Sequence, residues 1–293
     1  MEALLTQAFR SETMVAGKLA GGFVLTLAEA NHLRFFPDGG PATGAERAGF
    51  RFGDKGTHSS RTLMFADLEA VLAATPDGST RDAYAKAIIE GNWLQKATAS
   101  TRRISNQRLG ELFALDRTVA LFRVFRRLWT VAGDGRPLLA LLMALVRDPL
   151  LIASAEPVLT LPVGAELQRG PLRDALREVV GDRMNDDVLD KVARNTASTW
   201  TQTGHLEGRT FKVRKRAQPN APTVAFGLYV GHAAGFRGEE LLSSGWMAAL
   251  DCTASSAKSL ALEAKRVGLI DLRTAGDVVE FGLERLDPAV GRT

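Results

Sequence analysis

The chain has 293 residues, of which 45% are hydrophobic and 24% are charged, so it can bury a large core and is not disordered as a whole. The formal net charge is +4 and the pI is about 9.4, which favours an anionic partner without identifying one. Cys252 is the only cysteine, which excludes an intramolecular disulfide and a multi-cysteine zinc site. The four histidines are scattered without metal-ligand spacing, so we expect neither a metal nor a cofactor.

Targeting and membrane signals are weak. The N-terminus lacks a basic leader followed by an apolar stretch and a small-residue cleavage site. The most apolar run, residues 138–146, is about half of the ~20 residues that span a bilayer. We therefore expect a cytoplasmic protein without a membrane partner and assign this run to a buried core helix.

The periodicity of the apolar residues and the positions of the Gly and Pro residues predict a mainly α-helical protein. It should contain helix-turn-helix and winged-helix elements and short β-hairpin wings. Residues 1–116 form a predicted helical region with a helix-turn-helix and a glycine-rich segment at 38–60. Residues 117–217 form a second helical region that ends in a basic hairpin, and residues 218–293 form a winged-helix-like extension. The Pro-rich stretch 218–222 is the predicted linker.

The first region begins with a mostly helical pattern at 2–36. The glycine-rich segment 38–60 follows, which we expect to be a mobile loop or hairpin; it matches neither a P-loop nor a dinucleotide fingerprint. Ser79 and Asp82 have capping-box spacing at the start of a helix that reaches about residue 90. The next helix, 99–115, is expected to turn four apolar side chains inward: Ile104, Leu109, Leu112 and Phe113.

Four further helices are predicted at 117–131, 137–147, 171–180 and 186–203, the last capped by Asn185. In the first of these the aromatic residues should face inward and Arg123, Arg126 and Arg127 outward. A hairpin is predicted at 206–216. We expect the four tryptophans to be core anchors rather than stacking platforms: Trp93, Trp129, Trp200 and Trp246.

The last segment has the order of a winged helix, with helices at 244–250 and 254–267 before strands at 269–272 and 278–281. Its second helix carries Ser255, Ser256, Lys258 and Ser259, which are only weakly basic among acidic neighbours. We therefore favour packing or protein contacts over DNA contacts for this unit.

The strongest candidate for nucleic-acid binding is the start of the helix at 99–115, because no acidic residue occurs between Glu90 and Glu111. Hydroxyl, amide and guanidinium groups at a helix start suit phosphates and base edges. A solvated amphipathic helix is the alternative interpretation. The candidate residues are Lys96, Ser100, Thr101, Arg102, Arg103, Asn106, Gln107 and Arg108, with Arg102 and Asn106 on one face and Arg103 and Gln107 on another.

The second candidate is the hairpin, where five basic residues lie between positions 208 and 216 with no acid among them. Alternation would point Lys212, Arg214 and Arg216 to one side and Phe211 and Val213 to the other. Such a wing suits a phosphate backbone or a minor groove, although basic residues also protect an edge strand. The candidate residues are Arg209, Lys212, Arg214, Lys215 and Arg216.

Signals for catalysis are poor. The sequence has no nucleophile elbow, kinase set or Walker motif. Asp186, Asp187 and Asp190 suit the dipole of a helix start better than they suit metal binding. We therefore expect a protein that is not an enzyme.

Residues 92–104 resemble the BrxA family (DUF1819) of bacteriophage-exclusion (BREX) defence systems. A looser similarity covers 195–200 with Gly204, Leu206 and Gly208, and Ala97 departs from the basic residue expected there. The residues that carry the resemblance are Asn92, Leu94, Gln95, Lys96, Thr98, Ser100, Thr101, Arg102, Arg103, Ile104, Arg108 and Leu109. The resemblance implies an all-helical, non-enzymatic protein that binds double-stranded DNA beside other BREX proteins.

We therefore expect an accessory DNA-binding protein of a phage-defence system. Two alternatives stay open. One is a scaffold that assembles larger defence proteins, and the other is an RNA-binding protein.

Overall fold

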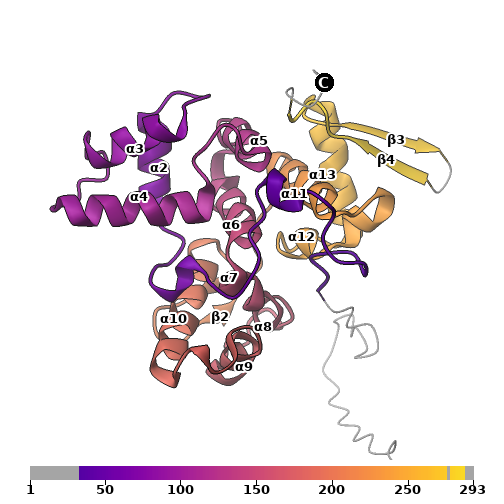
Figure 1. Ribbon diagram of the computed structural model, residues 1–293. Helices are drawn as coiled ribbons and strands as arrows, with labels where there is room; N and C mark the ends of the chain where they lie inside the picture. Colours follow the sequence, from indigo (N-terminus) through magenta and orange to yellow (C-terminus); the bar gives the residue numbers. More distant parts are fainter. Residues whose placement is uncertain (1–32, 276–277, 288–293) are drawn as a thin grey trace, which may run out of the picture. The chain divides into compact units, whose positions relative to one another are not determined.

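The computed structural model describes residues 33–275 and 278–287 (Figure 1). The helical stretch expected at 2–36 lies outside this part of the chain except for residues 33–36, which are not helical. The helices are α1 (Ala45–Ala48), α2 (Phe65–Ala74), α3 (Arg81–Ile89), α4 (Ala99–Phe113), α5 (Ala120–Trp129), α6 (Arg136–Arg147), α7 (Pro149–Ala153), α8 (Ala155–Leu159), α9 (Arg169–Val180), α10 (Asp186–Gln202), α11 (Ala221–Ala234), α12 (Gly245–Ala248) and α13 (Ala254–Arg266).

Short 3-10 turns connect several helices: η2 (Thr57–Ser59), η3 (Gly133–Gly135), η4 (Gly181–Arg183) and η5 (Gly238–Ser243). The strands form two antiparallel pairs, β1 (Leu206–Glu207) with β2 (Val213–Arg214) and β3 (Asp271–Ala275) with β4 (Val278–Gly282). The expected mainly α fold with short β-hairpins is therefore confirmed.

Polar side chains start the helices as the sequence suggests. Asn185 accepts a hydrogen bond from the backbone N–H of Val188 at 2.9 Å, which confirms it as the cap of α10. The cap of α3 is Thr80, one residue after the expected Ser79, and its hydroxyl accepts from Ala83 N at 3.3 Å. Each cap satisfies a backbone donor that has no partner inside the helix.

Helix α6 is the centre of the core and contacts α4, α5, α7 and α11. Residues 138–146 of this helix are all buried, so the apolar run is a core helix as expected. None of the helices within 33–275 and 278–287 has the length and apolar character that crossing a membrane requires. The expected boundaries between the three regions are at 116–117 and 217–218, and one cluster of buried side chains includes residues on both sides of each. The division into three regions stays a prediction.

The glycine-rich segment 38–60 is irregular apart from α1 and η2, but part of it is packed into the protein. Phe50 is buried and lies edge-on against Trp246, with ring centroids 5.8 Å apart. His58 is buried as well. A Cβ at Gly56 would lie 2.0 Å from an oxygen of Asp148, so a side chain at this position has no room. The expectation of a mobile loop is wrong where these residues anchor it.

The C-terminal unit has the expected order of helix, turn, helix and hairpin, with α12 before α13 and β3 paired with β4 (Figure 1). Leu272 lies opposite Phe281 in the register of this pair.

Trp93 and Arg126 do not have the burial that was expected for them. Trp129, Trp200 and Trp246 are buried core anchors, but Trp93 is 58% exposed because it lies in the connection between α3 and α4. Arg126 does not face outward. It is buried, and its Nη2 donates to the backbone carbonyls of Leu72 and Thr75 at 3.0 and 2.9 Å.

Candidate nucleic-acid interface

Helices α3 and α4 form the expected helix-turn-helix pair, joined by residues 90–98. Asn92 adopts a left-handed conformation with φ of 48°, and its side-chain oxygen accepts a hydrogen bond from Lys96 N at 2.9 Å. Thr98 then caps α4 by accepting from the backbone N–H of Thr101 at 3.1 Å. The motif at 92–104 thus builds the turn and the start of the second helix.

Most of the candidate residues in the turn before α4 and on α4 are bound within the protein. Lys96 pairs with Asp67 of α2 at 2.8 Å, and Arg102 donates to the carbonyl of Ile89 at the end of α3 at 2.9 Å. The backbone carbonyl of Asn106 accepts from Arg81 at 3.2 Å. These contacts hold α4 against its neighbours, so this side of the helix does not face a ligand.

The C-terminal half of α4 is tied in the same way. Arg108 forms an ion pair with Glu111 at 2.8 Å, and Gln107 donates to the same carboxylate at 2.9 Å. Thr101 contacts the hydroxyl of Thr98 at 2.9 Å. Ser100 and Arg103 are exposed, and neither side chain has a hydrogen-bond or ion-pair partner among the described residues. They are the members of this set that remain available to a ligand.

Helix α4 is also rotated relative to the expected orientation. Ile104 is 41% exposed, whereas Ser105 is buried in its place. The exposed side chains at helical spacing are therefore Ser100, Arg103, Ile104 and Gln107. Leu109, Leu112 and Phe113 face inward as expected.

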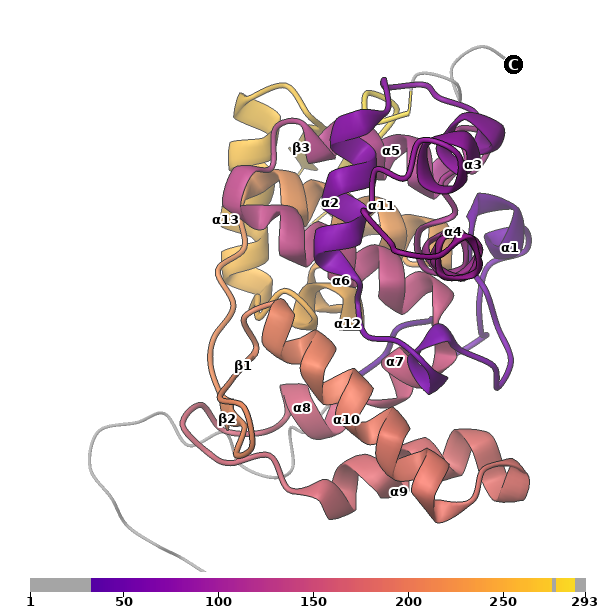
Figure 2. The same ribbon diagram turned by 90° about the vertical axis from the view of Figure 1, so that its left-hand side faces the viewer.

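A second helix-turn-helix, formed by α9, η4 and α10, leads directly into the basic hairpin. In this hairpin Leu206 pairs with Arg214 and Glu207 with Val213. Residues 164–167 flank the other side of β2, where Leu167 N donates to Lys212 O at 2.8 Å and Arg214 N donates to Ala165 O at 2.9 Å. Two helices followed by a short sheet with a projecting loop form a winged helix-turn-helix, in the lower part of Figure 2.

The expected alternation in the hairpin is wrong for Arg214. This residue is buried, and its guanidinium forms an ion pair with Asp251 and donates to the carbonyl of His205 at 3.3 Å. Asp251 also accepts from Ala217 N at 2.7 Å. Arg214 therefore joins the hairpin to the C-terminal unit and cannot reach a nucleic acid.

The remaining basic residues of the hairpin differ in exposure. Arg209 and Arg216 are exposed and have no ion-pair partner among the described residues. Lys215 is exposed and lies 3.3 Å from Glu207. Lys212 is half-buried and donates to Thr201 Oγ1 at 2.8 Å, and burial lowers the pKa of its ammonium group. Phe211, expected on the side of the hairpin opposite these cations, is 70% exposed.

A groove of about 840 Å³ lies between the start of α9, the outer face of α10 and the hairpin loop. We call it the wing groove. Its floor is apolar at Leu172, Ala193 and Ala197, and its rim is mostly cationic. The charged residues that line it are Glu166, Arg169, Asp190, Arg194, Arg209 and Lys212.

The cations of the wing groove are poorly neutralised. Arg169, Arg194 and Arg209 are exposed and have no ion-pair partner in the part of the chain that the structure describes. Asp190 is already paired with Arg173 at 3.1 Å. Arg169 and Arg194 were not predicted from the sequence, because they come from separate helices and only the fold brings them beside Arg209.

Acidic residues at the start of α10 are partly neutralised. Asp186 accepts from Arg173 at 3.1 Å and from Arg177 at 2.7 Å. Asp187 is exposed and is the carboxylate at this end that would repel a polyanion. A ligand with negative charge therefore fits the C-terminal half of α10 better than its start.

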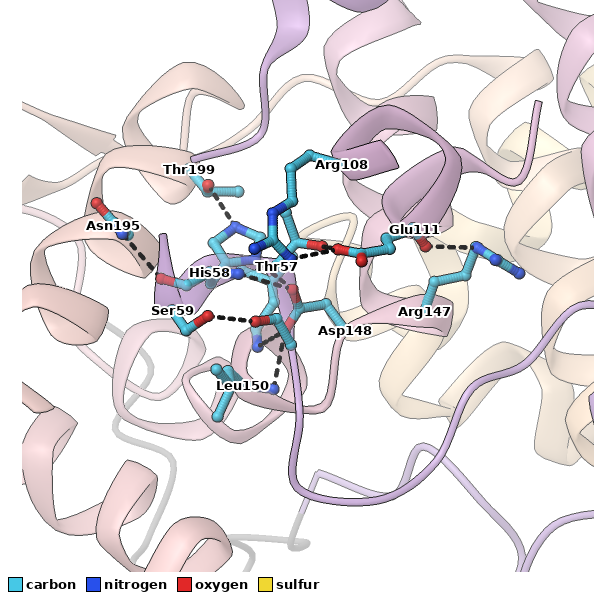
Figure 3. A network of polar contacts seen from close by, with 12 residues as sticks. Thr57, His58, Ser59, Arg108, Glu111, Arg147, Asp148, Leu150, Asn195 and Thr199 are labelled. Carbon is cyan, nitrogen blue, oxygen red and sulfur yellow. Dashed lines mark hydrogen bonds and ion pairs between the residues drawn. The ribbon is translucent and has the colours of Figure 1, made fainter. Parts of the chain in front are cut away.

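The two helix-turn-helix pairs are joined by a buried polar network around η2 (Figure 3). The imidazole of His58 contacts Asp148 Oδ2 through Nδ1 and Thr199 Oγ1 through Nε2, both at 2.8 Å. Asn195 donates to the carbonyl of His58 at 2.8 Å. His58 and Asp148 have no exposed surface, so they hold α10 against the base of α7 and cannot meet a substrate.

The other arm of this network reaches α4. Thr57 donates a hydrogen bond to the Glu111 carboxylate at 2.8 Å, and Arg108 donates to the same group (Figure 3). Gln107 also donates to this carboxylate. Burial raises the pKa of Glu111, but these hydrogen bonds outweigh burial and lower it. For Asp148, the charge and hydrogen bonds of His58 likewise outweigh burial and lower the pKa. Through η2, α4 and α10 are fixed relative to each other.

His205 is a second buried histidine, and its burial leads to a testable prediction about stability in acid. Burial lowers the pKa of His205 to about 4, and the cation Arg214 opposes its protonation while Asp251 favours it. In the unfolded chain this histidine protonates near pH 6.5. The folded state therefore loses stability, by roughly 3 kcal/mol, as pH falls from about 6.5 to about 4. Urea unfolding across this range should show the loss.

The variant His205→Gln removes this titration and should flatten that part of the stability curve. His232 is exposed, but partial burial and the charge of Arg237 lower its pKa as well, so His232→Gln should remove only a smaller part of the pH dependence. A wild-type protein whose stability is constant between these pH values would contradict the assignment.

Within the described residues no group of three or more His, Cys, Asp or Glu side chains is arranged to hold a metal ion. The chain matches no known protein family, and no curated protein is similar to it.

Proposed function

We propose that this protein is a non-enzymatic double-stranded DNA-binding protein whose wing groove receives the sugar-phosphate backbone. The observation that carries the proposal is the winged helix-turn-helix with three unneutralised arginines in the groove between α10 and the hairpin loop: Arg169, Arg194 and Arg209. Guanidinium groups bind phosphate oxygens in a bidentate manner and supply most of the sequence-independent affinity for DNA.

The geometry of the winged helix supports duplex DNA as the ligand. A helix-turn-helix places its second helix in the major groove, and a wing reaches the neighbouring minor groove. The backbone that separates these grooves then lies between helix and wing. In this protein that position is the wing groove, with Arg194 on the helix side and Arg209 on the wing side.

The face of α4 offers a second contact for the same duplex. Ser100 and Arg103 remain exposed on it, and η2 fixes α4 relative to α10 through the network of Thr57 and His58. A rigid link between two contact surfaces reduces the conformational entropy that is lost when both bind the same ligand. Arg103 and Arg194 would thus contact DNA as one unit.

The resemblance of residues 92–104 to the BrxA family supports a role beside other proteins of a BREX-type phage-defence system. In the fold these residues build the turn and the start of α4. We propose an accessory role in such a system, with the other defence proteins as partners.

Binding of the full chain to a fluorescent duplex at low salt, measured by anisotropy, tests the proposal. We expect saturable binding that structured RNA of equal length competes poorly. Absence of binding, together with a nuclease-insensitive pull-down of other defence proteins, would favour the scaffold function instead. Stronger competition by the RNA would favour RNA binding.

A further inference from the structure

We propose that Phe211 at the tip of the wing inserts between base pairs from the minor groove and kinks the bound duplex. The inference rests on the proposed function and adds a mode of recognition to it. Phe211 is 70% exposed and has no ring contact with any described aromatic residue. An apolar ring in this position gains from burial only when a ligand covers it.

The wing holds the backbone at Phe211 in a defined position. Gly208 has φ of 105°, and a Cβ there would lie 2.1 Å from the carbonyl oxygen of Phe211, so the loop folds tightly on itself. On the other side, Lys212 is fixed by its donation to Thr201 and by the backbone hydrogen bond from Leu167. Both residues that anchor the loop are therefore held, and Phe211 projects between them.

The surroundings of the ring favour bases over an apolar protein partner. Arg209 next to it is exposed, and Arg169 and Arg194 line the same groove, all without ion-pair partners among the described residues. An apolar group bordered by uncompensated cations complements stacked bases bordered by phosphates. Proteins that wedge apolar side chains into minor grooves combine these two features and bend the DNA toward the major groove.

The test uses duplexes with 2-aminopurine at a central pyrimidine–purine step and with a donor and acceptor dye at the two ends. These steps unstack most easily, so insertion should occur there first. We expect wild-type protein to raise the 2-aminopurine fluorescence and to bring the dyes closer. Phe211→Ala should abolish both signals and weaken binding roughly tenfold, because it removes a buried side chain from the complex.

Phe211→Leu keeps an apolar wedge and should retain part of both signals. Val131→Ala removes an exposed apolar side chain just after α5, outside the wing, and should behave as wild type. Thermal unfolding followed by circular dichroism verifies that each variant is folded.

Wild-type binding without a change in either signal would overturn the wedge and leave DNA binding intact. Wild-type signals from Phe211→Ala would also overturn the wedge and leave DNA binding intact. Absence of duplex binding by the wild-type protein would overturn the proposed function and, with it, the wedge.

Discussion

Replacing Arg214 by alanine is expected to lower the free energy of unfolding by about 3 kcal/mol, because the variant leaves the carboxylate of Asp251, which is only 10% exposed, without its cation. The variant also removes the hydrogen bond that Arg214 donates to the backbone carbonyl of His205. Urea unfolding followed by tryptophan fluorescence measures the change, since Trp200 is buried against His205.

Lys215→Ala is the matched control for this experiment. It removes a neighbouring basic residue that is exposed, and its effect should stay within about 0.5 kcal/mol. A loss of less than about 1 kcal/mol in Arg214→Ala would show that Arg214 is not the structural residue described above.

The double variant Arg194→Ala/Arg209→Ala should bind duplex DNA roughly a hundredfold more weakly than wild type. Each arginine contributes a charge-assisted hydrogen bond to phosphate, taken at about 1.5 kcal/mol, the lower end of the usual range, so the two together contribute about 3 kcal/mol. Both side chains are exposed and have no intramolecular ion pair with a described residue, so stability should be unchanged. Anisotropy titrations and thermal unfolding of the same samples separate the two effects.

Arg47→Ala/Arg117→Ala removes the same charge from exposed positions on α1 and before α5, outside the wing groove. This control should bind almost as tightly as wild type. Equal losses in both double variants would show that net charge, and not the groove, determines affinity.

Much of the fold could be predicted because its signals are local. Periodic apolar residues, caps such as Asn185 and the turn before α4 identify most helices and both hairpins. The central helix α6 follows from the apolar run 138–146. These patterns depend only on neighbours in the chain, so they need no tertiary information.

The orientation of charged and aromatic side chains was harder to predict. Strict alternation put Arg214 and Arg216 on the same side of the hairpin, whereas the structure buries Arg214 and exposes Arg216. The paired part of each strand is two residues long, too short for alternation to extend over 208–216. The partner of Arg214 is Asp251, 37 positions away, which no local pattern indicates.

The site itself is assembled by the fold. Arg169 begins α9, Arg194 lies on α10 and Arg209 lies in the wing loop, so only tertiary structure makes them neighbours. Ile104 was expected to be buried for a related reason. Its apolar character fits a core, but the way that α4 packs turns Ser105 inward instead.

The most direct test of the wing groove is a salt titration of duplex binding by wild type and by Arg194→Ala/Arg209→Ala. With phosphate contacts from Arg103, Arg169, Arg194 and Arg209, wild-type affinity should fall roughly a hundredfold between about 50 and 200 mM salt. The double variant should reduce the slope of log affinity against log salt by about two. A wild-type protein that does not bind at low salt, or a variant with an unchanged slope, would contradict the placement of the DNA backbone in this groove.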